Sequence, residues 1–88
     1  MLFEKIKKGL RISHSALDDE ISLNIDTAKL DLQLAGVEKL DDNDALIIKA
    51  ITLYCRWQFD YDNQADRYEL AYRALKIALS LSGDYNAK

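Results

Sequence analysis

Apolar side chains recur at helical spacing along most of this 88-residue chain. The pattern predicts a short helix over residues 2–8 and three longer helices over residues 15–35, 44–59 and 64–81. The sequence contains no proline, which favours long, uninterrupted helices. Because the connections between these segments are short, we expect a single domain over residues 1–88. Its expected fold class is all-α, a small antiparallel helical bundle of three longer helices plus a short N-terminal helix.

Residues that commonly begin or end helices lie at the boundaries of these segments. Three glycines are predicted to close helices, the first of them in a left-handed conformation: Gly9, Gly36 and Gly83. Ser15 and Asp18 resemble a capping box at the start of the second helix. Asp42 or Asn43 is the predicted N-cap of the third helix, and the Asp- and Asn-rich residues 60–63 predict a turn before the fourth.

The segment 44–59 is apolar around most of its circumference. Its polar residues Lys49, Thr52 and Arg56 are spaced three and four apart, which predicts one narrow exposed stripe. A helix that is apolar on nearly all sides is normally buried, so we expect this one to lie at the centre of the bundle. In the fourth helix, the residues expected to face inward are Tyr68, Ala71, Tyr72, Leu75, Ala78 and Leu79.

The second helix has more apolar residues than one buried face needs. Its surplus line consists of Leu23, Leu30 and Leu34. Because a chain of this length buries only a modest core, we expect these leucines to meet a neighbouring copy of the chain. Head-to-tail packing of identical subunits makes heterologous interfaces, which close into rings when the rotation between subunits permits.

Composition and charge narrow the class of protein. Hydrophobic residues make up 49% of the chain and charged residues 31%, which is a soluble globular balance. No apolar run approaches the roughly 18 residues that a membrane span needs, and early charges interrupt any signal-peptide core, so we expect a protein made and kept in the cytosol. A net charge of −3 argues against general nucleic-acid binding, which depends on a basic surface.

The sequence offers little catalytic or metal-binding chemistry. His14, the single histidine, lies in a serine-rich turn and is interpreted as a solvated loop residue rather than a general base. Cys55, the single cysteine, lies in the most apolar segment, where a thiol is normally an unreactive hydrophobe. The acidic groups at 18–20 and 41–44 lie at predicted helix starts, where capping and the helix dipole explain them. We therefore expect no catalytic residue, no cofactor and no metal site.

Two groups of residues leave a functional alternative open. One basic cluster consists of Lys5, Lys7, Lys8 and Arg11. It is suited either to contact with DNA or an acidic protein surface, or to being the solvated face of a short helix, and the second interpretation is favoured. The aromatic residues between positions 54 and 72 are expected to be mostly core, although Tyr and Trp are also enriched at interfaces.

Six segments, taken together in their order and spacing, resemble the phage head–tail connector family of tailed phages and prophages, also called adaptor, DNA-packaging or head-completion proteins. They span nearly the whole chain: LRIS (10–13), LDDEI (17–21), AKLDL (28–32), IIKAI (47–51), YDN (61–63) and LSLSGDY (79–85). Gln64 departs from the family pattern, because related sequences often have proline just after the YDN turn. That departure affects only the expected start of the fourth helix.

The resemblance implies a structural protein of the virion, made in the bacterial cytoplasm and located at the head–tail junction. Such proteins form a homo-oligomeric ring, usually a dodecamer matching the portal, which docks beneath the portal protein after DNA packaging. The ring completes the head, continues the DNA channel and receives further head-completion or tail proteins. The resemblance implies neither a cofactor nor catalysis nor membrane contact.

The resemblance also suggests roles for two groups of residues. Lys5, Lys7, Lys8 and Arg11 are candidates to face the channel, through which packaged DNA would pass without sequence-specific binding. Gly83, Asp84 and Tyr85 are candidates to contact the portal or a neighbouring subunit. We expect the tail over residues 83–88 to become ordered only on that contact.

Two other classes of function are weighed against this interpretation. One is a small helical DNA-binding regulator, because three helices with tight turns could include a helix-turn-helix. The predicted third helix, however, lacks the exposed polar side chains that read base edges. The other is a small enzyme or metal protein, for which metal ligands and a nucleophile pair are missing from the sequence.

Overall fold

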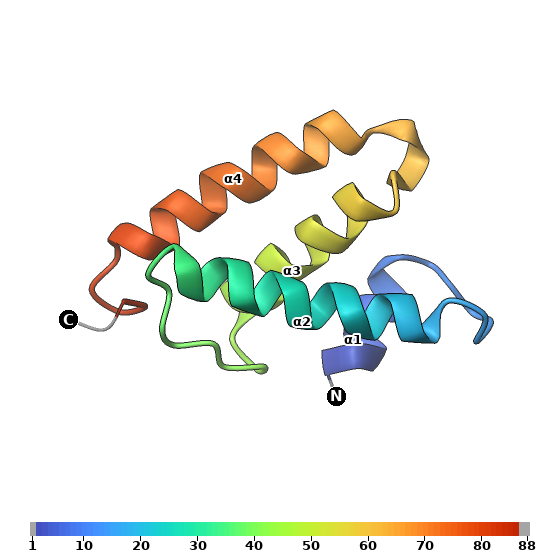
Figure 1. Cartoon of the computed structure of the whole chain (residues 1–88), viewed down its shortest axis with the longest axis horizontal. Coiled ribbons are helices and arrows are strands. Elements are labelled where there is room, and N and C mark those ends of the chain that lie inside the picture. Colours follow the sequence, from blue (N-terminus) through green and yellow to red (C-terminus); the bar gives the residue numbers. More distant parts are fainter. Residues whose placement is uncertain (1, 87–88) are drawn as a thin grey trace.

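The computed structural model describes residues 2–86 and is all-helical, which confirms the expected fold class. Its elements are α1 (Leu2–Gly9), α2 (Asp18–Leu34), α3 (Ala45–Gln58), the 3₁₀ turn η1 (Tyr61–Asn63) and α4 (Ala65–Leu81). In Figure 1, α3 runs in the opposite direction to α2 and α4 and lies behind and between them. Over the described residues, no helix is both long and apolar enough to cross a membrane.

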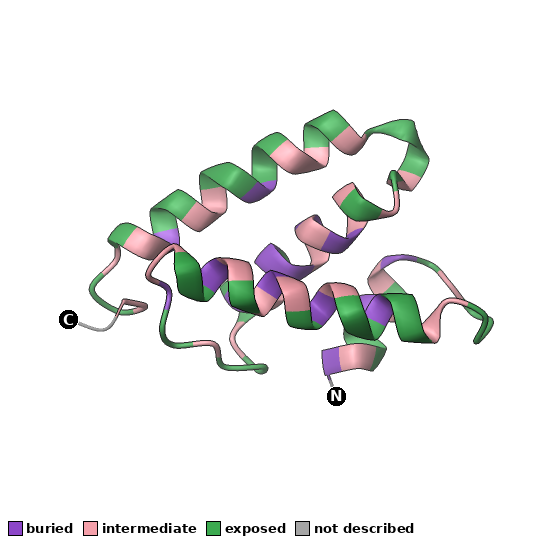
Figure 2. Cartoon of the chain, viewed as in Figure 1, coloured by how far each residue is buried: buried purple, intermediate pink, exposed green. Residues whose placement is uncertain are grey.

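Helix α3 forms the centre of the molecule, as its nearly continuous apolar surface predicts. It packs against α1, α2 and α4. Its buried residues are Ile47, Ala50, Ile51, Leu53 and Cys55. Figure 2 shows a different pattern on α2 and α4, where few residues are buried and the rest are intermediate or exposed. Each large aliphatic side chain in this core contributes about 1.5–3 kcal/mol to stability.

The polar stripe of α3 lies partly beneath α1, so the prediction that it is exposed is wrong for two of its three residues. Lys49 is exposed, whereas Thr52 and Arg56 are half-buried. The Arg56 guanidinium donates a hydrogen bond from Nη2 to the carbonyl oxygen of Gly9, at 3.0 Å. This bond satisfies a carbonyl at the end of α1 that has no partner within its own helix.

Gly9 lies close to α3 and does not have a left-handed backbone. It lies within α1, and the residue with positive φ after that helix is Arg11, at 57°. A Cβ at position 9 would meet Cγ2 of Thr52 at 3.4 Å. The prediction of a left-handed Gly9 is therefore wrong, because α1 turns two residues later and presses its last turn against α3.

The start of α2 also differs from the expectation. The helix begins at Asp18, after Leu17, and no side chain caps it, so the predicted capping box at Ser15 is wrong. The Asp18 carboxylate instead forms an ion pair with Lys7, with Nζ and Oδ1 separated by 2.8 Å. This contact fastens α1 to the first turn of α2, where negative charge also favours the helix dipole.

The end of α2 follows the prediction. Gly36 has φ of 101°, a conformation that costs glycine little. The amide of Val37 donates to Leu32 O at 2.9 Å, and that of Gly36 donates to Gln33 O at 3.0 Å. These two bonds form a Schellman motif, and Val37 and Leu32, the positions whose side chains usually meet in this motif, are both buried.

The N-cap of α3 is Asp44, so the predicted choice of Asp42 or Asn43 is wrong. The Asp44 carboxylate accepts hydrogen bonds from the amides of Leu46 and Ile47, at 2.9 and 3.3 Å. The amide of Asn43 instead donates to Asp41 Oδ1 in a local turn, at 2.8 Å. Several adjacent Asp and Asn residues suit an N-cap equally, and only the packing of α3 selects among them.

Helix α4 faces the core through a narrower stripe than predicted. Tyr72 and Leu79 are buried, and Tyr68 and Leu75 are half-buried, as expected. Ala71 and Ala78 are exposed, so their inward assignment is wrong, because α4 buries only a narrow stripe of its surface. The helix ends at Leu81, as predicted, before an extended Ser82, and Gly83 follows without a positive φ.

The predicted turn between α3 and α4 is confirmed. Asp60, Asp62 and Asn63 all have positive φ, between 48° and 58°. Asp and Asn tolerate this conformation better than other residues with side chains. Asp60 Oδ1 also accepts a hydrogen bond from the amide of Ala65, at 3.1 Å, which joins the turn to the first residue of α4.

Candidate interaction surface

The surplus leucines of α2 are exposed in the isolated chain. Leu23, Leu30 and Leu34 are between 60% and 88% exposed. The opposite side of the same helix holds its buried residues Ile21, Ile25, Ala28 and Leu32. The core therefore leaves this second apolar line uncovered, and contact of the three leucines with a neighbouring subunit stays a prediction.

Helix α4 has a matching apolar line that the analysis of the sequence missed. Leu70, Ile77 and Leu81 are between 58% and 78% exposed. They follow one another at intervals of seven and four residues, as Leu23, Leu30 and Leu34 do. The repeated spacing is visible in the sequence and would have identified the second line.

In each line, one smaller residue fills the gap between the first two large residues, and the result is the spacing of a heptad seam. The α2 face comprises Leu23, Thr27, Leu30 and Leu34. The α4 face comprises Leu70, Ala74, Ile77 and Leu81. Successive members of each face are four, three and four residues apart, which is the spacing that two packed helices use for their contact. Both helices have 17 residues, so each presents a face along most of its length.

A groove runs between α2 and α4 over the surface of α3. Its volume is about 250 Å³, and its lining consists of Thr27, Leu30, Asp31, Leu34, Tyr54, Trp57, Arg73 and Lys76. Tyr54 and Trp57 belong to α3, and their rings meet edge to face with centroids 5.5 Å apart. The α2 face thus continues into an aromatic floor, which enlarges the apolar area available to a partner.

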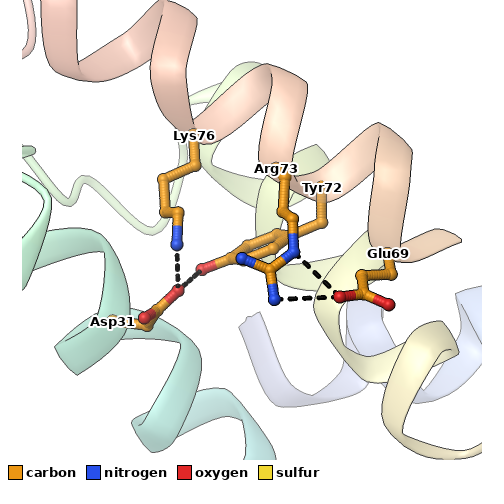
Figure 3. A network of polar contacts seen from close by, with 5 residues as sticks. All are labelled: Asp31, Glu69, Tyr72, Arg73 and Lys76. Atoms are coloured by element: carbon orange, nitrogen blue, oxygen red, sulfur yellow. Dashed lines mark hydrogen bonds and ion pairs between the residues drawn. The ribbon is translucent and has the colours of Figure 1, made fainter.

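A polar network crosses the groove and fixes α4 relative to α2 (Figure 3). Asp31 accepts hydrogen bonds from the Tyr72 hydroxyl at 2.6 Å and from Lys76 Nζ at 3.0 Å. Burial alone raises the pKa of Asp31, but these two hydrogen bonds and the nearby positive charges outweigh it, so the pKa is lowered. Burial, followed by the bond to Asp31, raises the pKa of Tyr72. Both groups therefore keep the protonation states that hold the network together.

The two helices differ in charge. Helix α2 contains five acidic residues and one lysine, a formal charge of −4, whereas α4 contains three basic and two acidic residues, a formal charge of +1. The exposed Glu20 and Asp26 lie beside the α2 face. The exposed Arg67 and Arg73 lie beside the α4 face. Asp66 also lies beside the α4 face, and Arg73 pairs with Glu69 at 2.9 Å. The faces are therefore alike in apolar spacing and lie on helices of opposite net charge.

Only three of the four residues in the predicted basic cluster are exposed to solvent. Lys7 is half-buried, pairs with Asp18 and lies over the ring of Phe3, with Nζ 5.9 Å from the centroid. Lys5, Lys8 and Arg11 are exposed at the α1 end of the molecule. Contact of this cluster with DNA stays a prediction.

The C-terminal tail already has partners within the chain. The Tyr85 hydroxyl lies 3.0 and 2.9 Å from the two carboxylate oxygens of Asp44. The carbonyl oxygen of Tyr85 accepts hydrogen bonds from the amides of Glu38 and Lys39, at 2.8 and 3.1 Å. The expectation that the tail is ordered only on contact with a partner is therefore wrong as far as residue 86, and residues 87–88 lie outside the described part. Contact of Gly83, Asp84 and Tyr85 with a portal stays a prediction.

The groups weighed for chemistry lie apart from this surface. His14 is exposed, and its Nδ1 accepts a hydrogen bond from the amide of Ala16, at 3.3 Å. Cys55 is buried in α3, and burial raises the pKa of its thiol to about 12, which keeps it protonated and unreactive. Within residues 2–86, no group of three or more His, Cys, Asp or Glu side chains is arranged to hold a metal ion.

Comparison with known proteins identifies the family. A family model described as phage connector protein matches residues 2–86, which confirms the resemblance found in the sequence. Comparisons with curated proteins and with solved structures found no match. The matching region includes all four helices and both apolar faces. Since the match covers nearly the whole chain, this protein belongs to the phage connector protein family.

Proposed function

We propose that this chain is the repeating subunit of a ring that joins the portal of a tailed-phage or prophage head to its tail. The family match supports the connector role. The main support for a ring comes from the two uncovered apolar faces on α2 and α4. A subunit with two different uncovered apolar faces can associate head to tail. Such contacts close into a ring when the rotation that relates neighbouring subunits permits it.

In this proposal, the ring docks beneath the portal after DNA packaging, completes the head and continues the exit channel. Its stoichiometry matches the portal, as a dodecamer.

The exposed Lys5, Lys8 and Arg11 are suited to line a channel through which DNA passes without sequence-specific binding, because they offer positive charge without a helix that reads base edges. The turn at Gly83 and Asp84 is suited to meet the portal or the next protein below, since it is exposed at one end of the molecule.

The alternative of a DNA-binding regulator has little support in the fold. A recognition helix must present exposed polar side chains to base edges. Helix α3 is instead covered by the other three helices, and α2 is strongly acidic. Neither helix suits the electronegative surface of DNA.

Deletion of the gene from the phage or prophage tests the proposed function. We expect packaged heads without attached tails and a loss of infectious particles, both restored by the wild-type gene supplied in trans. Free tails should accumulate, because only the junction is missing. Normal yields of tailed, infectious particles in the deletion strain would refute the connector role.

A further inference from the structure

We infer that the α2 face of one copy packs in parallel against the α4 face of the next copy. The inference rests on the proposed ring and names the surfaces that hold it together. The occupant of each face is thus a second copy of this chain rather than an unrelated partner. Three observations on the described helices lead to this assignment: matched apolar spacing, opposite charge and the groove beside the α2 face.

The apolar spacing of the two faces is the same over their whole length. Leu23, Leu30 and Leu34 correspond to Leu70, Ile77 and Leu81, and each set spans about 16 Å at a rise of 1.5 Å per residue. The small Ala74 opposes Thr27, which allows the helix axes to approach closely. In register, the leucine and isoleucine side chains of the α4 face can enter the groove floored by Tyr54 and Trp57.

Charge selects the pairing of unlike faces and its direction. Glu20 lies three residues before Leu23, and Arg67 lies three residues before Leu70. In a parallel, in-register pair, Glu20 of one copy is therefore next to Arg67 of the other. A contact between two α2 faces would instead bring Glu20 and Asp26 against the same acidic residues, and like charges disfavour that pairing.

Two single substitutions separate the faces. Leu30→Asp disables the α2 face and Ile77→Asp disables the α4 face. Both side chains are mostly exposed, so the variants should fold like the wild type, and circular dichroism checks this. Leu46→Asp is the matched control, because Leu46 is a partly exposed leucine that belongs to neither face.

Sedimentation velocity at protein concentrations up to about 1 mM gives the readout. We expect the wild type and Leu46→Asp to form oligomers and each face variant alone to remain monomeric. An equimolar mixture of Leu30→Asp and Ile77→Asp should form a one-to-one dimer and nothing larger, because only one intact α2 face and one intact α4 face can meet. Dimers of either variant alone would show that like faces pair and would overturn the inference.

The direction of packing has its own test. Glu20→Arg should weaken self-association by about 2- to 5-fold, and adding Arg67→Glu to the same chain should restore it. An antiparallel contact would place these residues at opposite ends of the interface, so the second substitution would then restore nothing.

Wild-type protein that stays monomeric at about 1 mM, or face variants that assemble like the wild type, would also overturn the inference. These results leave the deletion phenotype untouched, so failure here is distinguishable from failure of the connector role.

Discussion

The Tyr85 hydroxyl lies 3.0 and 2.9 Å from the two carboxylate oxygens of Asp44, a residue 41 positions earlier in the chain. Asp44 is also the N-cap of the central helix α3. One carboxylate therefore holds both the start of the core helix and the C-terminal tail. Loss of the Asp44 carboxylate should therefore release both the tail and the cap of α3, whereas loss of the tail leaves the cap in place.

Tyr85→Phe removes the hydroxyl and keeps the ring. We expect the tail to detach more often while the helices stay intact, because Asp44 can still cap α3. Hydrogen exchange measured by NMR should be faster at the amides of Glu38 and Lys39, which donate to Tyr85 O, and unchanged at Leu46. Equal exchange at Glu38 and Lys39 in both proteins would show that the hydroxyl does not hold the tail.

The attachment of the tail should depend on pH at both extremes. The hydrogen bond from Tyr85 lowers the pKa of Asp44 below its ordinary value of 3.8, so its contribution is present above that pH and is lost as the pH falls through the lowered pKa. The bond to Asp44 raises the pKa of Tyr85 above 10.0, so its contribution is present below that pH and is lost as the pH rises through the raised pKa. An NMR titration should show the Asp44 pKa moving up in Tyr85→Phe, and an unchanged value would contradict the link.

The network across the groove predicts a moderate effect of Tyr72→Phe. The substitution removes one hydrogen bond to the charged Asp31 but leaves the buried ring, so we expect a loss of about 1.5–3 kcal/mol in the free energy of unfolding. The pKa of Asp31 should rise, because it loses a donor. Urea denaturation and an NMR titration measure the two effects. Tyr72→Ala is the comparison and should cost about 3–5 kcal/mol, since it also empties the core.

Arg56 connects three parts of the fold. Besides its bond to Gly9 O, its guanidinium carbon lies 5.2 and 5.7 Å from the ring centroids of Tyr61 and Tyr68. Arg56→Ala should destabilise the protein by about 1–3 kcal/mol in urea denaturation, because it leaves a helix-end carbonyl unpaired and removes packing on two rings. A loss as small as that of Lys49→Ala, an exposed neighbour on α3, would show that these contacts contribute little.

The helices and the central place of α3 follow from apolar periodicity alone, because burial of apolar area dominates folding. The wrong predictions concern exposure and capping, which depend on how the helices pack against one another. Nothing local distinguishes Thr52 and Arg56 from solvated residues until α1 is placed over them. The choice of Asp44 as N-cap likewise depends on the packing of α3 and on Tyr85, which is remote in sequence.

Only the α2 part of the candidate interaction surface was predicted from the sequence. Leu23, Leu30 and Leu34 were identified as surplus because a stronger apolar line shares their helix. On α4, Leu70, Ile77 and Leu81 were overlooked, although their spacing in the sequence repeats that of the three leucines on α2. The groove, its aromatic floor and the polar network across it require three helices in space, so local sequence patterns could not reveal them.

Electron cryomicroscopy of the head–tail junction in purified particles tests the central claim most directly. We predict a ring of small helical subunits between the portal and the first tail protein, into which copies of this chain fit with α2 of each subunit against α4 of the next. The ring should be missing from particles made without the gene. A junction that looks the same with and without this chain would contradict the account.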